Sequence, residues 1–251
     1  MVGRLDRWLP VSGQVAFFEA PAGDVAHAFG ADLAEVELAT SAAVVDGAFP
    51  DVLRELEPID GTRVLLVPGG GWTAMFQSSS APDLWSAWSN VTRRLGVRSA
   101  MAEASPNVYG RGKGANTLLR YADPGAEREW FGGARQLEAS YTEDGWEFDA
   151  EGEPQPWEDP SAYEARRVAD RLPPALVHAY LDAIGVPPLD GPAWGPGGHL
   201  VTLLPREPEP RGRGLLGRRR AEPEPEPEPD DEPVAQTIAE LHESMYGDLA
   251  G

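Results

Sequence analysis

Short runs of apolar or alternating residues along the chain predict a series of β-strands. Residues 11–19, centred on Gln14-Val15-Ala16-Phe17-Phe18, are apolar and aromatic and favour an opening strand. Residues 63–67 and 72–76 predict a β-hairpin, because the glycines between them can adopt the positive φ angles that a tight reversal requires. Further strands are predicted at residues 97–103, 116–121, 135–141, 145–148 and 199–204, and turn signals separate the first four into an antiparallel meander.

Helical periodicity occurs between these strands. One helix is predicted after Pro21 and a short one after Pro50, since proline is favoured in the first turn of a helix. A third begins at Pro82 and ends at Gly96. Its apolar stripe consists of Leu84, Trp88, Val91 and Leu95, which recur at helical spacing.

A fourth helix is predicted from Asp159, as N-cap, through Pro160 in the first turn to Arg171. Pro173-Pro174 interrupts it, and a restarted helix ends at Gly185. The apolar stripe of the restarted helix consists of Leu176, Val177, Tyr180, Leu181 and Ile184.

Strands and helices are mixed without regular alternation, which favours an α+β fold with a mostly antiparallel sheet and helices packed on it. Residues 1–205 form the expected globular domain, with a subdivision near residues 50–62 as an alternative. Residues 206–233 are a charged Pro-Glu linker, predicted to be disordered because it has almost no apolar residue to bury. Residues 234–251 predict a short amphipathic helix that carries Val234, Ile238, Leu241 and Met245 at helical spacing, with Tyr246 beside them.

Composition narrows the functional classes. The 41 acidic and 21 basic residues give a net charge of −20, which opposes nucleic-acid binding and favours a basic protein partner or simple solubility. The absence of cysteine excludes disulfides, thiolate metal sites and a thiol nucleophile, and fits a reducing compartment. The chain shows no signal-peptide pattern and no apolar run of about twenty residues, so a cytoplasmic protein without membrane insertion is expected.

The most suggestive loop for chemistry is residues 109–117. Arg111 and Lys113 alternate there with Gly112 and Gly114, so backbone N–H groups and positive charge could bind an anion. The spacing misses the P-loop pattern, and a plain hairpin loop is the favoured alternative. No histidine pair has metal-ligand spacing and no nucleophile elbow is present, so no catalytic residue, metal ligand or cofactor is assigned. Acidic pairs such as Glu147/Asp149 are interpreted as a solvated strand face.

Residues 146–171 combine aromatic residues, prolines and arginines. Trp157 and Tyr163 are therefore candidate protein-binding residues, with packing at a strand–helix junction as the favoured alternative. This run resembles a pattern in uncharacterised proteins of high-GC Gram-positive bacteria. The hairpin that ends in Gly71-Trp72-Thr73-Ala74 is similar to hairpins of small proteins encoded beside polymorphic toxins. The resemblance implies an immunity-type binder, an acidic α+β domain that blocks a toxin by covering its active site.

Three functional hypotheses follow. The leading one is a non-enzymatic intracellular protein-binding module of immunity or adaptor type, in which residues 234–251 form a tethered docking helix. The second is an enzyme that acts on a small anionic substrate bound at residues 109–117. The third is a cargo or scaffold protein that its C-terminal helix addresses to an assembly.

Overall fold

The computed structural model describes residues 14–58, 62–78, 85–105, 116–124, 134–142, 144–189 and 192–204. Its strands are β1 Gln14–Phe18, β2 Thr40–Val45, β3 Arg63–Gly69, β4 Trp72–Gln77, β5 Ser99–Ser105, β6 Asn116–Ala122, β7 Arg135–Thr142, β8 Gly145–Glu151 and β9 Gly198–Leu203. The α-helices are α1 Ala22–Glu35, α2 Trp85–Leu95 and α3 Pro174–Ala183, and the 3-10 helices are η2 Asp51–Leu56, η3 Pro160–Glu164 and η4 Val168–Asp170.

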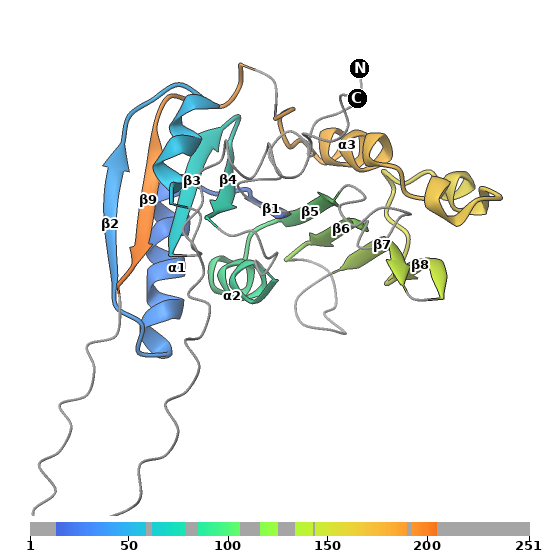
Figure 1. Ribbon diagram of the computed structural model, residues 1–251, viewed down its shortest axis with the longest axis horizontal. Coiled ribbons are helices and arrows are strands. Elements are labelled where there is room, and N and C mark those ends of the chain that lie inside the picture. Colours follow the sequence, from blue (N-terminus) through green and yellow to red (C-terminus); the bar gives the residue numbers. More distant parts are fainter. Residues whose placement is uncertain are drawn as a thin grey trace, which may run out of the picture.

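Within these ranges the strands form one antiparallel sheet in the order β2-β9-β3-β4-β1-β5-β6-β7-β8 (Figure 1). The expected α+β fold with an antiparallel sheet and packed helices is therefore confirmed. Strands β5 to β8 are the predicted meander. Strands from both sides of residues 50–62 belong to the same sheet, because β9 lies between β2 and β3.

The central strands are buried on both faces, which is uncommon for an antiparallel sheet. In β1, Ala16 and Phe18 pack in one core together with Trp88 of α2. Phe17, between them, packs in a second core with Val177 of α3. Figure 1 shows α2 and α3 on opposite sides of this part of the sheet. Covering on both sides explains why β1 and β4 are almost continuously apolar rather than alternating.

The predicted continuous helix from Asp159 to Arg171 is wrong. Asp159 does cap η3, since its carboxylate accepts a hydrogen bond from the Ser161 amide, and Pro160 opens the first turn. The helix ends at Glu164, however, and the backbone is extended at Ala165 and Arg167 before η4 begins. No residue of η3 or η4 is buried, so tertiary packing does not stabilise further helical turns.

Strand β2 was not predicted. Its sequence, Thr-Ser-Ala-Ala-Val-Val, lacks alternation, and its four central residues are exposed. It exists because β9 pairs with it along its whole length, from Thr40↔Leu203 to Val45↔Gly198. None of the helices in the described ranges is long and apolar enough to cross a membrane.

Candidate functional site

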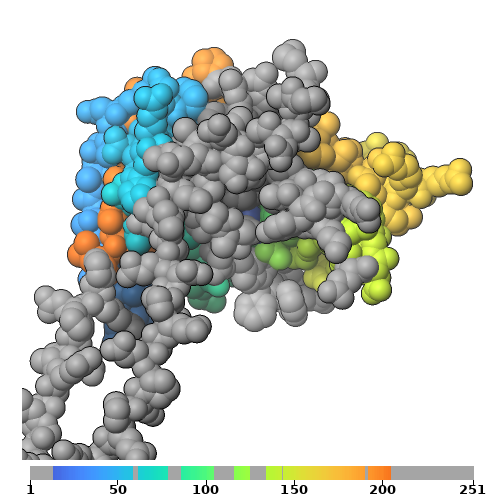
Figure 2. Space-filling model, viewed as in Figure 1, coloured from blue at the N-terminus to red at the C-terminus, as the bar shows by residue number. Residues whose placement is uncertain are grey.

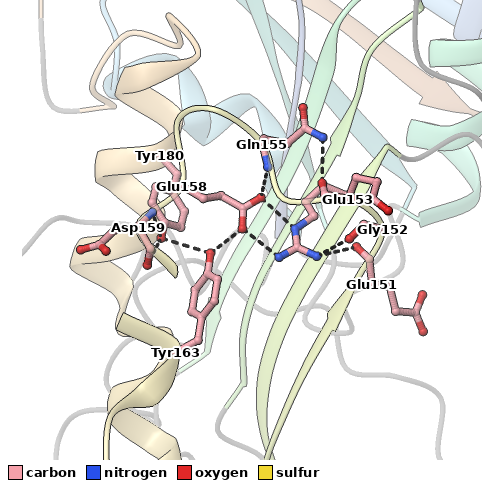
Figure 3. Close-up of polar contacts among 9 residues, drawn as sticks. Glu151, Gly152, Glu153, Gln155, Glu158, Asp159, Tyr163 and Tyr180 are labelled. Atoms are coloured by element: carbon pink, nitrogen blue, oxygen red, sulfur yellow. Dashed lines mark hydrogen bonds and ion pairs between the residues drawn. The ribbon is translucent and has the colours of Figure 1, made fainter. Parts of the chain in front are cut away.

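A buried ion pair holds the chain after β8 against the sheet. The Nε and Nη2 atoms of Arg135 donate to the two carboxylate oxygens of Glu158, each at 2.8 Å (Figure 3). Nη1 of Arg135 donates to the carbonyl oxygens of Gly152 at 2.6 Å and Glu151 at 3.1 Å. The two side chains are only 4% and 0% exposed. This bidentate geometry is the strong form of an arginine–carboxylate pair.

Two tyrosines complete this group, which we call the Arg135 cluster: Arg135, Glu158, Tyr163 and Tyr180. The Tyr163 hydroxyl donates to Glu158 at 2.7 Å and lies 3.1 Å from the Tyr180 hydroxyl. The Gln155 amide donates to Glu158 at 2.7 Å, and the Asp159 amide donates to the Tyr180 hydroxyl at 2.9 Å. Figure 3 shows these side chains converging between β7 and the segment that leads into η3.

Burial and hydrogen bonding shift the pKa values of two groups in the Arg135 cluster. Burial alone would raise the pKa of Glu158, but the hydrogen bonds from Arg135, the Gln155 amide and Tyr163 lower it overall. Burial, with the hydrogen bonds to Tyr180 and Glu158, raises the pKa of the Tyr163 hydroxyl. These shifts keep the carboxylate of Glu158 charged and the hydroxyl of Tyr163 protonated near neutral pH. The ion pair and its hydrogen bonds are therefore retained there, and they join the segment after β8 to the sheet.

The candidate binding residues Trp157 and Tyr163 lie beside this ion pair. Trp157 packs edge-on against Tyr121, with ring centroids 5.5 Å apart, and 5.2 Å from the ring of Tyr180. Tyr163 packs against Phe148 at 5.1 Å. Both side chains are partly buried against the core on the α3 side of the sheet, and their role in binding stays a prediction.

The opposite face of the sheet, on the side of α1 and α2, carries polar residues on β1 and on β5 to β8. We call this set the polar face; it consists of Gln14, Glu103, Arg120, Gln136, Glu138, Ser140, Glu147, Asp149 and Glu151. Strand register places them in rows across the sheet. One row pairs Gln14 with Glu103, Glu103 with Leu118, Leu118 with Glu138 and Glu138 with Asp149. The next row pairs Met101 with Arg120, Arg120 with Gln136 and Gln136 with Glu151.

Residues of the core show on which side of the sheet the polar face lies. Met101 and Leu118, members of these rows, pack with Trp88 and Val91 of α2. Directly paired residues of neighbouring strands point to the same side of a sheet. In the described residues α2 packs on β5, whereas η4 contacts β7 and β8 on the opposite face, alongside Phe148. The polar face therefore begins where the helical cover of α2 ends.

Hydrogen bonds order the inner part of the polar face. Nε2 of Gln14 donates to Glu103 at 2.8 Å, and both residues are buried. Nε of Arg120 donates to Gln136 at 2.8 Å, and Gln136 in turn donates to Glu138 at 3.4 Å. Glu147, Asp149 and Glu151 on β8 are exposed. The expectation that Glu147 and Asp149 lie on a solvated strand face is confirmed.

The carboxylates of the polar face interact electrostatically with one another. Burial raises the pKa of Glu138, and the charges of Glu103, Asp149 and Glu151 raise it further, while Arg120 opposes them. Burial lowers the pKa of Arg120, although the charges of Glu138, Glu103 and Glu151 favour its charged form. Three carboxylates thus act on the one guanidinium of the polar face, so that acidic residues outnumber basic ones there.

The other candidate residues lie outside the described residues. This applies to the loop residues Arg111, Gly112, Lys113 and Gly114 and to the helix residues Val234, Ile238, Leu241, Met245 and Tyr246. The strands that flank the loop, β5 and β6, pair from Ser99↔Ala122 to Ser105↔Asn116, so residues 106–115 do connect a β-hairpin. Among the described residues no group of three or more histidine, aspartate or glutamate side chains is arranged to hold a metal ion.

Comparisons with known proteins identify no relative: no protein-family model, curated protein or solved structure matches the chain. The site must therefore be interpreted from its own chemistry. Sequence reasoning missed both Arg120 and Glu138 as members of a polar face. The signal was present as alternation in β7, where Gln136, Glu138 and Ser140 interleave with buried Leu137 and Ala139.

Proposed function

We propose that this protein is a non-enzymatic intracellular protein-binding module, of immunity or adaptor type, that binds a basic partner through its polar face. The observation that carries the proposal is the excess of carboxylates on the polar face. Glu138, Glu147, Asp149 and Glu151 are half-buried or exposed on β7 and β8, and Arg120 is the one guanidinium of this set. The absence of cysteine supports an intracellular setting.

The physical argument rests on charge and rigidity. The carboxylates of the polar face stand on paired strands, so they are held at fixed spacing, and only part of their charge is neutralised by Arg120. A rigid negative surface attracts a basic protein, accelerates its association and selects against acidic competitors. It also repels the phosphates of nucleic acids.

The tethered segment at residues 234–251 fits the same function. As an amphipathic helix on a Pro-Glu linker, it would add a second contact with the same partner or assembly. A linker raises the effective concentration of the second contact, so two weak contacts together bind tightly.

The proposal is tested with the full chain as bait in its native host. Three baits are compared: the natural chain, the polar-face variant E138Q/D149N/E151Q and a control variant E55Q/E164Q/D182N. The control removes the same charge at exposed residues outside the polar face. A basic partner should be enriched by the natural chain and by the control, and its affinity for the polar-face variant should fall about tenfold or more.

The proposal would be contradicted by partners that bind all three baits equally, or by losses that are the same in both variants. Circular dichroism of the variants verifies that each bait is folded. A partner retained by the polar-face variant but lost on removal of residues 234–251 would instead assign recognition to the helix alone.

A further inference from the structure

Among the described residues, the sheet ends at β2 with no strand on its outer side. In the part of the chain that the structure describes, β2 is the terminal strand and pairs only with β9 (Figure 1). Along the free side of an edge strand, alternate residues present unpaired backbone N–H and C=O groups. Ser41, Ala42, Ala43 and Val44 are exposed, and Figure 2 shows β2 at the rim of the molecule.

Edge strands usually carry features that prevent pairing with another chain, such as charges, prolines or bulges. Strand β8, at the other edge, has Glu147, Asp149 and Glu151. Strand β2 has no charged residue, no proline and no glycine over its six residues, and it pairs with β9 in unbroken register. The two edges of one sheet therefore differ in chemistry.

Exposed apolar side chains lie along the same edge of the sheet. In the described ranges, the exposed large hydrophobic residues are Val36, Val44 and Leu204, with 57%, 75% and 42% of their surface accessible to solvent. Val44 lies in β2, Val36 ends α1 just before it, and the Leu204 amide donates to the Ala39 carbonyl at the start of β2. Apolar exposure in this part of the chain is thus concentrated along one edge.

We propose that β2 is a strand-addition site for an extended segment of a partner protein, uncharged and β-branched in its centre and basic at both ends. The strand requirement follows from the free backbone groups, and the uncharged centre from Val44 and its alanine neighbours. The basic ends follow from charge, because exposed Glu37 and Asp46 stand on either side of β2. This surface is separate from the polar face and does not depend on it.

A second copy of the chain fits this edge less well. Antiparallel pairing of two β2 strands would bring Glu37 of one copy near Asp46 of the other, where like charges repel. Each copy also carries a net charge of −20, which opposes association at a neutral edge. A basic-ended segment gains from the same charges.

The test uses the full chain and a synthetic peptide, acetyl-Arg-Arg-Val-Thr-Val-Thr-Val-Arg-Arg-amide, in fluorescence anisotropy. An analogue with methylated amides at its five central residues keeps the charge and side chains but cannot pair as a strand. We expect the analogue to bind about tenfold or more weakly, and Val44→Lys to weaken the parent peptide by about as much. Ala183→Lys, which adds the same charge at an exposed residue of α3, should leave binding unchanged.

Equal binding of the peptide and its methylated analogue would overturn the proposal, because charge alone would then explain the attraction. So would the absence of any binding. A dimer in sedimentation equilibrium that Val44→Lys abolishes would assign the edge to a second copy. Hydrogen exchange of the β2 amides tests the chain's own tail. If exchange is slow and becomes fast in the variant R211A/R213A/R218A, the tail occupies the β2 edge. The variant E138Q/D149N/E151Q should bind the peptide normally, so failure here and failure of the polar face are distinguishable.

Discussion

At the scale of residues, Arg135 is the least expected side chain in the core. It lies on the same side of β7 as Leu137 and Ala139, which are buried. A guanidinium is tolerated there because Glu158 and the carbonyls of Glu151 and Gly152 accept its hydrogen bonds. The pair joins β7 to the segment around Glu158, 23 residues further along the chain, and holds that segment on the α3 side of the sheet.

Removing one partner of this pair should be costly. Glu158→Gln leaves a buried positive charge without its counter-ion and should lower the free energy of unfolding by about 3 kcal/mol. The double variant R135M/E158M replaces both charges with apolar groups and should recover most of that loss. Urea denaturation measures both values. If E158Q were as stable as the natural protein, the buried charge of Arg135 would have to be compensated by water or by a shift of neighbouring groups.

The same pair predicts a pH dependence. The folded-state pKa of Glu158 is lowered, so the folded protein binds fewer protons than the unfolded chain as the pH falls. Its contribution is complete above the unfolded pKa of about 4.3 and is lost as the pH falls through the lower folded value. The stability difference between the natural protein and E158Q should therefore be constant from about pH 5 to 8 and shrink below about pH 4. A difference that grows in acid would contradict this assignment.

At the scale of elements, η3 begins at a side-chain cap. The carboxylate of Asp159 accepts hydrogen bonds from the Ser161 amide at 3.1 Å and the Ser161 hydroxyl at 2.6 Å. Asp159→Ala should therefore cost about 1 kcal/mol of stability, and Asp159→Asn much less. Asp170→Ala is the matched control, since its ion pair with Arg167 is exposed and contributes little. Equal losses for D159A and D170A in urea denaturation would argue against the cap.

Strand β2, in contrast, has a local sequence that does not favour a strand. Alanine does not favour strands, and the four central side chains are exposed. Its backbone is held by the ladder with β9, whose own inner side pairs with β3. An element of this kind depends on contacts between distant parts of the chain, and among the described residues it ends the sheet without a charge or a proline.

At the scale of the whole molecule, the two proposed binding surfaces are far apart in the strand order. The polar face extends from β1 to β8 in the strand order, and the edge strand β2 lies at the other end of the sheet. Both favour a positively charged partner, one through side-chain charge and the other through backbone pairing between acidic flanks. A partner with a basic surface and an extended basic-ended segment could use both, and the two contacts would reinforce each other if their spacing matched.

Local patterns were sufficient for much of the fold. Period-two alternation and turn residues predicted the meander from β5 to β8. Helical spacing predicted α2, with Trp88 in the core, and the exposed Glu147/Asp149 pair followed from strand alternation. These features depend on neighbours within about ten residues, which is the range over which periodicity is encoded.

Other features depended on contacts between distant residues. The insertion of β9 beside β2, the end of η3 at Glu164 and the pairing of Arg135 with Glu158 were not predictable from local sequence. Each depends on which surfaces become buried when remote segments meet, and burial decides whether a charge needs a partner or a weak strand persists. Residue types and spacing therefore predicted most of the elements, whereas long-range packing decided their order, the Arg135 cluster and the positions of the two proposed binding surfaces.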